Sequence, residues 1–223
     1  LQLQASGGAI KSVAVRAFQQ RARGEKDPQN SPIQHLRADA VVVACGSYSA
    51  PLLRSVGLRV PIYPGKGYSA TFALRRPEAA PWVSTIDDAK KIAMSRLGDS
   101  LRVAGTIELS GWDLTLDSPL AQARCHMLAR RIETLLPGVC DTRLPHEGGQ
   151  PQFWAGLRPA TPTNIPLIGA TPLAGLWLNA GHGTLGWTHG AGSGRALAAL
   201  MSGERPALSF RFLGESGVPP ELL

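Results

Sequence analysis

The sequence predicts a mixed α/β fold that is interrupted by an α+β module of antiparallel strands. Residues 38–45 (ADAVVVAC) form a continuous β-branched run, which is typical of a strand buried on both faces. Residues 62–109 contain several strand-like stretches, and a single helical pattern follows them. Residues 175–201 have the pattern of a strand, a glycine-rich turn and a helix. We therefore expect three segments, covering residues 1–60, 61–152 and 153–223.

The first segment is predicted to contain two strands and a short helix. Residues 9–17 (AIKSVAVRA) alternate apolar and polar side chains, as a half-buried strand does. Residues 24–32 are polar and carry two prolines, which indicates a loop. The strand at 38–45 is expected to end at Gly46, and a short helix to begin within residues 49–53.

The middle segment is predicted to be an antiparallel sheet with one helix. Ser118 suits the N-cap of a helix and Pro119 suits its first position. Apolar residues then recur at helical spacing until Pro137 and Gly138. A hairpin is expected to turn at residues 97–99. The strands are expected at residues 62–74, 82–86, 91–96 and 100–109.

The last segment is predicted to place a glycine-rich turn between a strand and a helix. After Phe153 the chain is rich in proline and glycine, which indicates a stiff loop. Residues 175–180 (GLWLNA) predict a short buried strand, and the turn spans residues 181–186. A helix of small and apolar residues is expected over 187–201, and a last strand over 207–212.

Composition indicates a globular protein with a substantial core. The chain has 223 residues, of which 43% are hydrophobic. Its net charge of +7 is spread without a basic block interleaved with aromatic residues, so we expect no nucleic-acid partner. The three cysteines form no zinc or disulfide pattern, which favours reduced thiols in the cytoplasm. Neither a membrane-spanning run nor a signal peptide is expected.

The glycine-rich turn is the first candidate site. Gly181–Gly186 (GHGTLG) matches the G-x-G-x-x-G of dinucleotide-binding folds. We do not favour that interpretation, because Rossmann domains carry the motif on their first strand and too few residues follow it here. The glycines could also simply permit a tight crossover from strand to helix. The helix start offers free N–H groups and partial positive charge, which suits a reduced flavin ring.

Arg158 is the second candidate. It is the only Asp, Glu, Lys or Arg between Glu147 and Arg195, and its neighbours in FWAGLRP are apolar. A charge in such surroundings needs a partner, and a guanidinium can bind a carboxylate through two parallel hydrogen bonds. An ion pair with an acidic residue, or simple exposure to solvent, would explain the presence of Arg158 in this apolar stretch equally well. The nearby prolines would stiffen the loop for substrate binding.

Four stretches carry a resemblance to a known family. With them, the chain resembles the bacterial D-amino acid dehydrogenases of the D-amino acid oxidase and glycine oxidase superfamily. The GHGTLGWT motif is specific to that subgroup, whereas GLRP marks the wider superfamily. The resemblance covers nearly the whole chain except the loop at 24–32 and the last residues. The four stretches are ADAVVVACGSYSAPLL at 38–53, VPIYPGKGYS at 60–69, FWAGLRPATPTNIPLIG at 153–169 and LWLNAGHGTLGWTHGAGSG at 176–194.

The resemblance implies a split FAD-binding domain with an inserted antiparallel substrate-binding domain. It implies that a hydride passes from the Cα of a D-amino acid to flavin N5, and that the imino acid hydrolyses to a 2-oxo acid and ammonia. The electrons would pass to a quinone or the respiratory chain. The protein would lie in the cytoplasm, either free or bound peripherally to the inner face of the bacterial inner membrane.

The resemblance also implies roles for individual residues. Arg158 would bind the substrate carboxylate, Tyr68 would belong to the substrate pocket, and His182 would lie beside the flavin. Ala44 and Gly46 would lie near the adenosine and pyrophosphate part of FAD. The flavin ring would be lined by Gly181, Gly183, Thr184, Leu185, Gly186, Trp187 and Thr188.

One part of the family pattern does not occur in this sequence. The amino-terminal G-x-G-x-x-G that cradles the FAD diphosphate is not present, nor is the acid that holds the ribose. We therefore expect a carboxyl-terminal part of such an enzyme, which would need the missing amino-terminal segment as its partner. Two alternatives remain open: an inactive remnant or non-catalytic binding module, and an amine oxidase of the glycine or sarcosine oxidase type.

Overall fold

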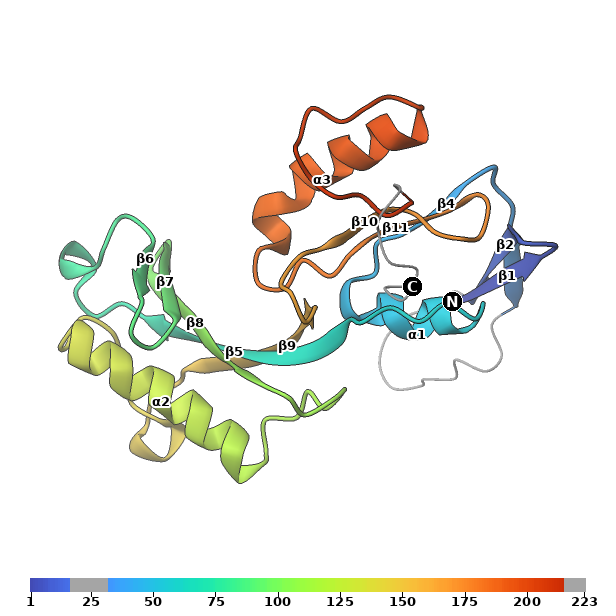
Figure 1. The fold of residues 1–223 in the computed structure, drawn as a ribbon. Helices are drawn as coiled ribbons and strands as arrows, with labels where there is room; N and C mark the ends of the chain where they lie inside the picture. Colours follow the sequence, from blue (N-terminus) through green and yellow to red (C-terminus); the bar gives the residue numbers. More distant parts are fainter. Residues whose placement is uncertain (17–31, 215–223) are drawn as a thin grey trace. The chain divides into compact units, whose positions relative to one another are not determined.

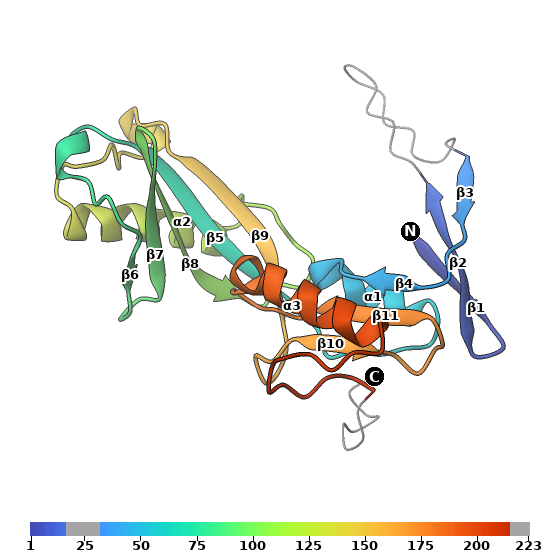
Figure 2. The ribbon, with the colours of Figure 1, turned by 90° about the horizontal axis from the view of Figure 1, so that it is seen from above.

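A computed structural model describes residues 1–16 and 32–214 of the chain, drawn as ribbons in Figures 1 and 2. The chain divides into two compact units. The first unit combines residues 1–63 with the chain from Pro159 onward, and the second comprises residues 64–158. The second unit begins close to the border expected at residue 61. It ends beyond the border expected at residue 152, because a strand continues through Arg158.

The first unit contains a three-stranded sheet in the order β10-β11-β4. β11 runs parallel to β4, with Leu178 opposite Val43, and antiparallel to β10. Helix α3 (Gly186–Met201) follows β11, and its residues Ala196 and Leu197 pack with Ile168 of β10. The strands are β4 (Val41–Val43), β10 (Leu167–Ala170) and β11 (Leu176–Ala180).

A second, antiparallel sheet in the same unit has the order β1-β2-β3. β1 and β2 form a hairpin whose turn residues, Gly7 and Gly8, have φ of 59° and 74°. The apolar residues Leu3 and Ile10 pack into one core with Leu53 of helix α1 (Ser49–Arg54). The strands are β1 (Gln2–Ser6), β2 (Ala9–Arg16) and β3 (Ile33–Leu36).

The second unit is a five-stranded sheet in the order β6-β7-β8-β5-β9, with helix α2 (Pro119–Leu135) along one face, as Figure 1 shows. Leu128 and Ile132 of α2 are fully buried against Phe72 and Leu101 of the sheet. The side chain of Ser118 accepts a hydrogen bond from the backbone of Ala121 at 3.2 Å, so the expected N-cap is confirmed. The strands are β5 (Tyr63–Ala73), β6 (Thr85–Asp87), β7 (Ile92–Leu97), β8 (Ser100–Glu108) and β9 (Gln152–Ala160).

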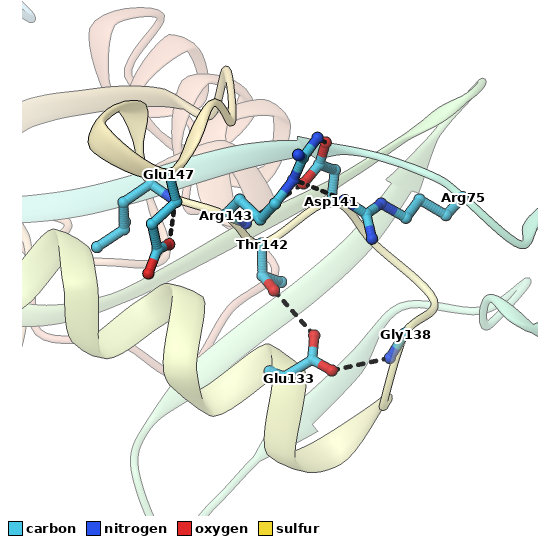
Figure 3. Close-up of polar contacts among 8 residues, drawn as sticks. Arg75, Glu133, Gly138, Asp141, Thr142, Arg143 and Glu147 are labelled. Carbon is cyan, nitrogen blue, oxygen red and sulfur yellow. Dashed lines mark hydrogen bonds and ion pairs between the residues drawn. The ribbon is translucent and has the colours of Figure 1, made fainter.

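A cluster of polar contacts holds the segment that follows α2 (Figure 3). The Glu133 carboxylate accepts hydrogen bonds from the backbone N–H of Gly138 at 3.0 Å and the hydroxyl of Thr142 at 2.8 Å. The Asp141 carboxylate accepts hydrogen bonds from two guanidinium groups, those of Arg75 at 2.9 Å and Arg143 at 2.8–2.9 Å. These contacts join the segment after α2 to the carboxyl end of β5.

The strand expected at 38–45 is shorter and less buried than its sequence suggested. Only Val41–Val43 form β4, and Val42 is 41% exposed. Among the described residues β4 pairs with β11 alone, so one of its edges carries no strand. The β-branched run thus predicted a strand, but burial on both faces was wrong for the described structure.

Four further expectations need correction or comment. The loop expected after Phe153 holds two strands, β9 and β10. Pro159 is accommodated because β9 lies at the edge of its sheet.

Residues 207–212 form no strand, and only an isolated bridge joins Leu213 to Gly169. β6 begins at Thr85, later than the strand expected at 82–86, and the loop expected at 24–32 falls almost entirely outside the described residues. No helix in the described ranges combines the length and apolar character needed to cross a bilayer.

Candidate functional site

The glycine-rich turn joins the end of β11 to the start of α3. Gly181 and Gly183 have φ of 83° and 55°, values that L side chains rarely adopt. A Cβ atom at Gly181 would lie 2.7 Å from Cγ2 of Thr161, so close packing also requires glycine there. The N–H of Gly183 donates a hydrogen bond to the carbonyl of Pro159 at 2.9 Å, and that of Leu185 donates to His182 at 3.0 Å. These two bonds fix the path of the turn.

The amino-terminal end of α3 is open for binding. Leu185 is its N-cap, no side chain caps the end, and the first turn contains no acidic residue. Leu185 is 51% exposed, Trp187 is fully exposed, and Thr184 and Thr188 are exposed as well. Uncapped N–H groups at a helix start carry partial positive charge and favour an anionic or electron-rich group. The residues from Gly181 to Thr188 thus form an exposed, electropositive helix start that suits an electron-rich group.

Ala44 and Gly46 lie at the same edge of the sheet as the glycine-rich turn. β4 and β11 are parallel neighbours, so the segments that follow their carboxyl ends lie side by side. Gly46 has φ of 55°, and a Cβ atom placed on it would meet no other atom within 4 Å. The backbone N–H of Cys45 donates to the hydroxyl of Ser49 at 3.1 Å, which fastens the start of α1. Crevices at the carboxyl ends of parallel strands are the usual nucleotide sites of such sheets.

His182 is partly buried, and its Nε2 atom has no hydrogen-bond partner among the described residues. Burial lowers the pKa of its imidazole below 6.5, and the neighbouring His189, whose ring lies 6.4 Å away, lowers it further. The ring is therefore neutral near pH 7. An apolar cavity of about 330 Å³ adjoins it, lined also by Thr188 and Phe210. A neutral imidazole at this place can donate or accept one hydrogen bond without adding charge to the turn.

Arg158 lies on β9 in the second unit, where the described part of the chain offers it no acidic partner. Its Nη1 atom donates a hydrogen bond to the carbonyl of Thr106 at 2.5 Å. Within the described ranges, no carboxylate lies at ion-pair distance from its guanidinium. Burial lowers the pKa of the Arg158 guanidinium, which still remains charged at neutral pH. Among residues 1–16 and 32–214 the ion-pair alternative for Arg158 is thus not realised, which leaves a partly buried cation that an anionic ligand could pair with.

Tyr68 belongs to the core of the second unit. Its side chain is 1% exposed and lies with Phe72 in the cluster under α2. Its hydroxyl donates a hydrogen bond to the Glu108 carboxylate, and burial, followed by that contact, raises the pKa of the phenol. These contacts favour a structural role for Tyr68 in the second unit.

Two residues that contact Arg158, Gly67 and Thr106, were not expected from the sequence. A Cβ atom at Gly67 would lie 2.3 Å from the central guanidinium carbon of Arg158. Glycines at alternating strand positions, as Gly65 and Gly67 are, signal close approach of another group and could have indicated this contact. The backbone of Thr106 gave no such signal, because its φ of 59° is unusual for a β-branched residue.

The structure thus brings the candidate residues together in two groups. Ala44 and Gly46 share one sheet edge with the turn at 181–188 in the first unit. Arg158 shares its surroundings with Gly67 and Thr106 in the second unit.

Comparison with known proteins identifies the family. Residues 1–200 match the DAO family model, described as FAD dependent oxidoreductase. D-amino acid dehydrogenase of Dechloromonas aromatica (strain RCB) is 49% identical over 180 residues, which are 81% of this chain and 41% of that protein. D-amino acid dehydrogenase of Cereibacter sphaeroides is 46% identical over 185 residues, 82% of this chain and 40% of that protein.

Solved structures share the fold. Iminodiacetate oxidase from Chelativorans sp. BNC1 is similar with a TM-score of 0.70 at 24% identity, over 93% of this chain and 50% of that one. Glycine oxidase from Bacillus cereus is similar with a TM-score of 0.65 at 20% identity, and the match covers 92% of this chain and 49% of that one. The chain spans about two fifths of the length of the curated relatives it matches. The family match over most of the sequence shows that the chain belongs to the DAO family of FAD-dependent oxidoreductases.

Proposed function

We propose that this chain is the carboxyl-terminal part of an FAD-dependent D-amino acid dehydrogenase. The observation that carries this proposal is Arg158, a partly buried guanidinium without an acidic partner in the described ranges. A protein keeps such a charge out of water only where something compensates it. The carboxylate of an amino acid supplies that compensation, and the names of the relatives point to D-amino acids as its source.

Arg158 would bind and orient the substrate. Its fork of N–H groups can hold both oxygens of the carboxylate, which fixes the direction of the Cα–H bond. Orientation is the main contribution required, because a neutral amine needs no strong protein base for hydride loss. The product imino acid would hydrolyse in water to a 2-oxo acid and ammonia.

FAD fits the first unit, and it supplies the hydride acceptor when bound. The open start of α3 and the residues from Gly181 to Thr188 would hold the flavin ring. Ala44 and Gly46 would lie near the adenosine and pyrophosphate part, at the carboxyl end of β4. His182 would contribute a neutral hydrogen-bonding group beside the ring.

The partners of the whole protein follow from the same proposal. The relatives are more than twice as long as the matched region, so an amino-terminal segment would complete the FAD site. A quinone or the respiratory chain would receive the electrons, either in the cytoplasm or at the inner face of the inner membrane. A glycine or sarcosine oxidase activity is the second candidate, because the chain shares its fold with a glycine oxidase.

Purification of the full-length protein tests the proposal. A D-amino acid dehydrogenase will bind FAD stoichiometrically and reduce a quinone-type dye with D-alanine faster than with glycine or sarcosine. A protein that prefers glycine or sarcosine would support the second candidate. A flavin-free protein that oxidises none of the three would support the inactive remnant or binding module.

A further inference from the structure

The guanidinium of Arg158 lies over a strand position that has no side chain. A Cβ atom at Gly67 would meet the central carbon of the guanidinium at 2.3 Å, Nη1 at 2.6 Å and Nε at 2.7 Å. Three such similar distances mean that the flat face of the group covers Gly67. Any larger residue at position 67 would therefore displace the charged end of Arg158, which is flexible, and would leave the backbone in place.

β8 has a bulge opposite the same glycine. Lys66 pairs with Glu108 and Tyr68 pairs with Gly105, so Gly67 alone faces the two residues Thr106 and Ile107. Extra residues of this kind redirect backbone groups and occur often beside active sites. Here the bulge turns the Thr106 carbonyl toward Arg158, whose Nη1 donates to it at 2.5 Å.

Two features of Thr106 at this bulge are energetically unfavourable. Its φ of 59° lies in the left-handed region, which a β-branched residue rarely adopts. Its hydroxyl is buried and has no hydrogen-bond partner among the described residues. Backbone strain and unpaired buried polar atoms persist where the surroundings impose them, and they concentrate at functional sites.

We propose that Gly67 and Thr106 form a seat that positions Arg158 for carboxylate binding. Gly67 leaves room for the flat face of the guanidinium, and the Thr106 carbonyl holds Nη1. The edge formed by Nε and Nη2 then remains for two parallel hydrogen bonds to a carboxylate. Both are positioning residues, since they act through Arg158. The proposal rests on the function proposed above for Arg158 and names the elements that determine its selectivity for carboxylates.

Replacement of the glycine is the first test. Gly67→Ala in the full-length protein should raise the KM for D-alanine by about 10-fold or more and change kcat little. Its melting temperature should stay close to that of the wild type, because only the end of a flexible side chain must move. Gly65→Ala is the matched control, since its Cβ would meet the end of the Ile107 side chain at 2.5 Å and the backbone carbonyl of Arg158 at an ordinary 3.6 Å, with no guanidinium atom among its nearest neighbours. An unchanged KM in Gly67→Ala would overturn the seat.

A double-mutant cycle tests whether Gly67 acts through Arg158. In an Arg158→Met background, Gly67→Ala should add no further increase in KM, because the group that it displaces is gone. An equal increase in both backgrounds would contradict the proposal, since Gly67 would then act elsewhere.

Relief of the strain at Thr106 is the third test. Thr106→Gly should not lower the melting temperature, because glycine adopts the left-handed conformation freely. It should nevertheless raise the KM several-fold, since the carbonyl that holds Nη1 becomes less fixed. Thr106→Asn, which tolerates this conformation, should restore part of the loss. Lys91→Gly is the control, because exposed Lys91 has φ of 52° and lies outside the seat. A wild-type KM in Thr106→Gly would contradict the role of Thr106.

Binding of a non-reacting carboxylate separates this proposal from the proposed function. Calorimetric titration with benzoate should show weaker binding to Gly67→Ala than to the wild type. If the wild type binds benzoate but oxidises no D-amino acid, the proposed function fails and the seat is retained. If Gly67→Ala and the wild type bind benzoate equally while Arg158→Met loses binding, the seat fails and the role of Arg158 is retained.

Discussion

The hydroxyl of Tyr68 donates a hydrogen bond to the carboxylate of Glu108 on the face of the sheet that α2 covers. Because side chains alternate along a strand, Tyr68 and its neighbour Gly67 point to opposite faces of β5. Arg158 covers Gly67, so the Tyr68 ring lies on the other side of the sheet from the guanidinium. Tyr68 and Arg158, both of which were expected at the substrate pocket, thus lie on opposite faces of one sheet.

Tyr68→Phe should therefore weaken folding without changing substrate binding. Loss of the hydroxyl leaves the mostly buried Glu108 carboxylate with Arg124, whose Nε lies at 3.6 Å, and should cost about 1–2 kcal/mol of unfolding free energy. Chemical denaturation of the full-length protein measures this loss, and steady-state kinetics with D-alanine should show an unchanged KM. A large rise in KM at unchanged stability would return Tyr68 to the substrate pocket.

A negative charge at the start of α3 should separate helix stability from flavin binding. In Thr188→Asp, the new carboxylate interacts favourably with the helix dipole and should stabilise α3 by roughly 0.5 kcal/mol. The same charge should repel the electron-rich edge of a flavin and raise the dissociation constant of FAD by about 10-fold. Titration of the apoprotein with FAD, followed by flavin fluorescence, measures the affinity.

The control for this variant is Thr188→Asn, which has nearly the same shape and no charge. It should bind FAD about as well as the wild type. Equal FAD affinity in Thr188→Asp and Thr188→Asn would mean that the start of α3 does not face the flavin.

The Asp141 carboxylate should make the stability of the second unit depend on pH in the acidic range. Hydrogen bonds from Arg143, with a further contribution from Arg75, hold the pKa of its carboxyl well below the usual 3.8. A carboxyl with a lowered pKa in the folded state stabilises folding above its unfolded pKa, and the stabilisation disappears as the pH falls toward the folded value. Asp141→Asn should therefore lower the melting temperature at about pH 7 and flatten its decline below about pH 4.

Thermal unfolding from about pH 7 to about pH 2.5 checks this expectation. Asp88→Asn is a suitable control, because the Asp88 side chain is 86% exposed and pairs only with Lys91 in the described ranges. If Asp141→Asn and Asp88→Asn had the same pH profile as the wild type, the cluster in Figure 3 would not stabilise the fold.

Much of the fold was accessible from local sequence signals. Ser118 and Pro119 marked the start of α2, and the apolar spacing that follows marked its buried face. The strand, turn and helix around Gly181–Gly186 were also recognisable, because an apolar strand and a small-residue helix flank the glycines. In these places the local propensity agrees with the tertiary environment.

The remaining elements depended on information outside their own residues. β9 was mistaken for a loop because Gly156 and Pro159 interrupt it, and only its edge position in the sheet tolerates them. β1 was missed, although Gly7-Gly8 is a typical turn of a two-residue hairpin. Val42 was expected to be buried, because the β-branched run around it does not reveal how many strands pair with β4.

The candidate site divides in the same way. Arg158 and the glycine turn stood out by residue type, since a lone charge and a run of glycines are unusual in apolar surroundings. The alternating glycines at 65 and 67 were a usable signal for close approach of another group, but the partner of Gly67 and the role of Thr106 depend on a bulge between two strands that are far apart in the chain.

Discrimination between D-alanine and D-alaninamide tests the central claim most directly. The amide lacks the carboxylate that Arg158 is proposed to bind, so the wild-type protein should prefer D-alanine by about 100-fold or more in kcat/KM. Arg158→Lys, whose single ammonium cannot reproduce the fork, should lose most of this preference by a rise in the KM for D-alanine alone. An Arg158→Lys variant that keeps the wild-type preference would contradict the account.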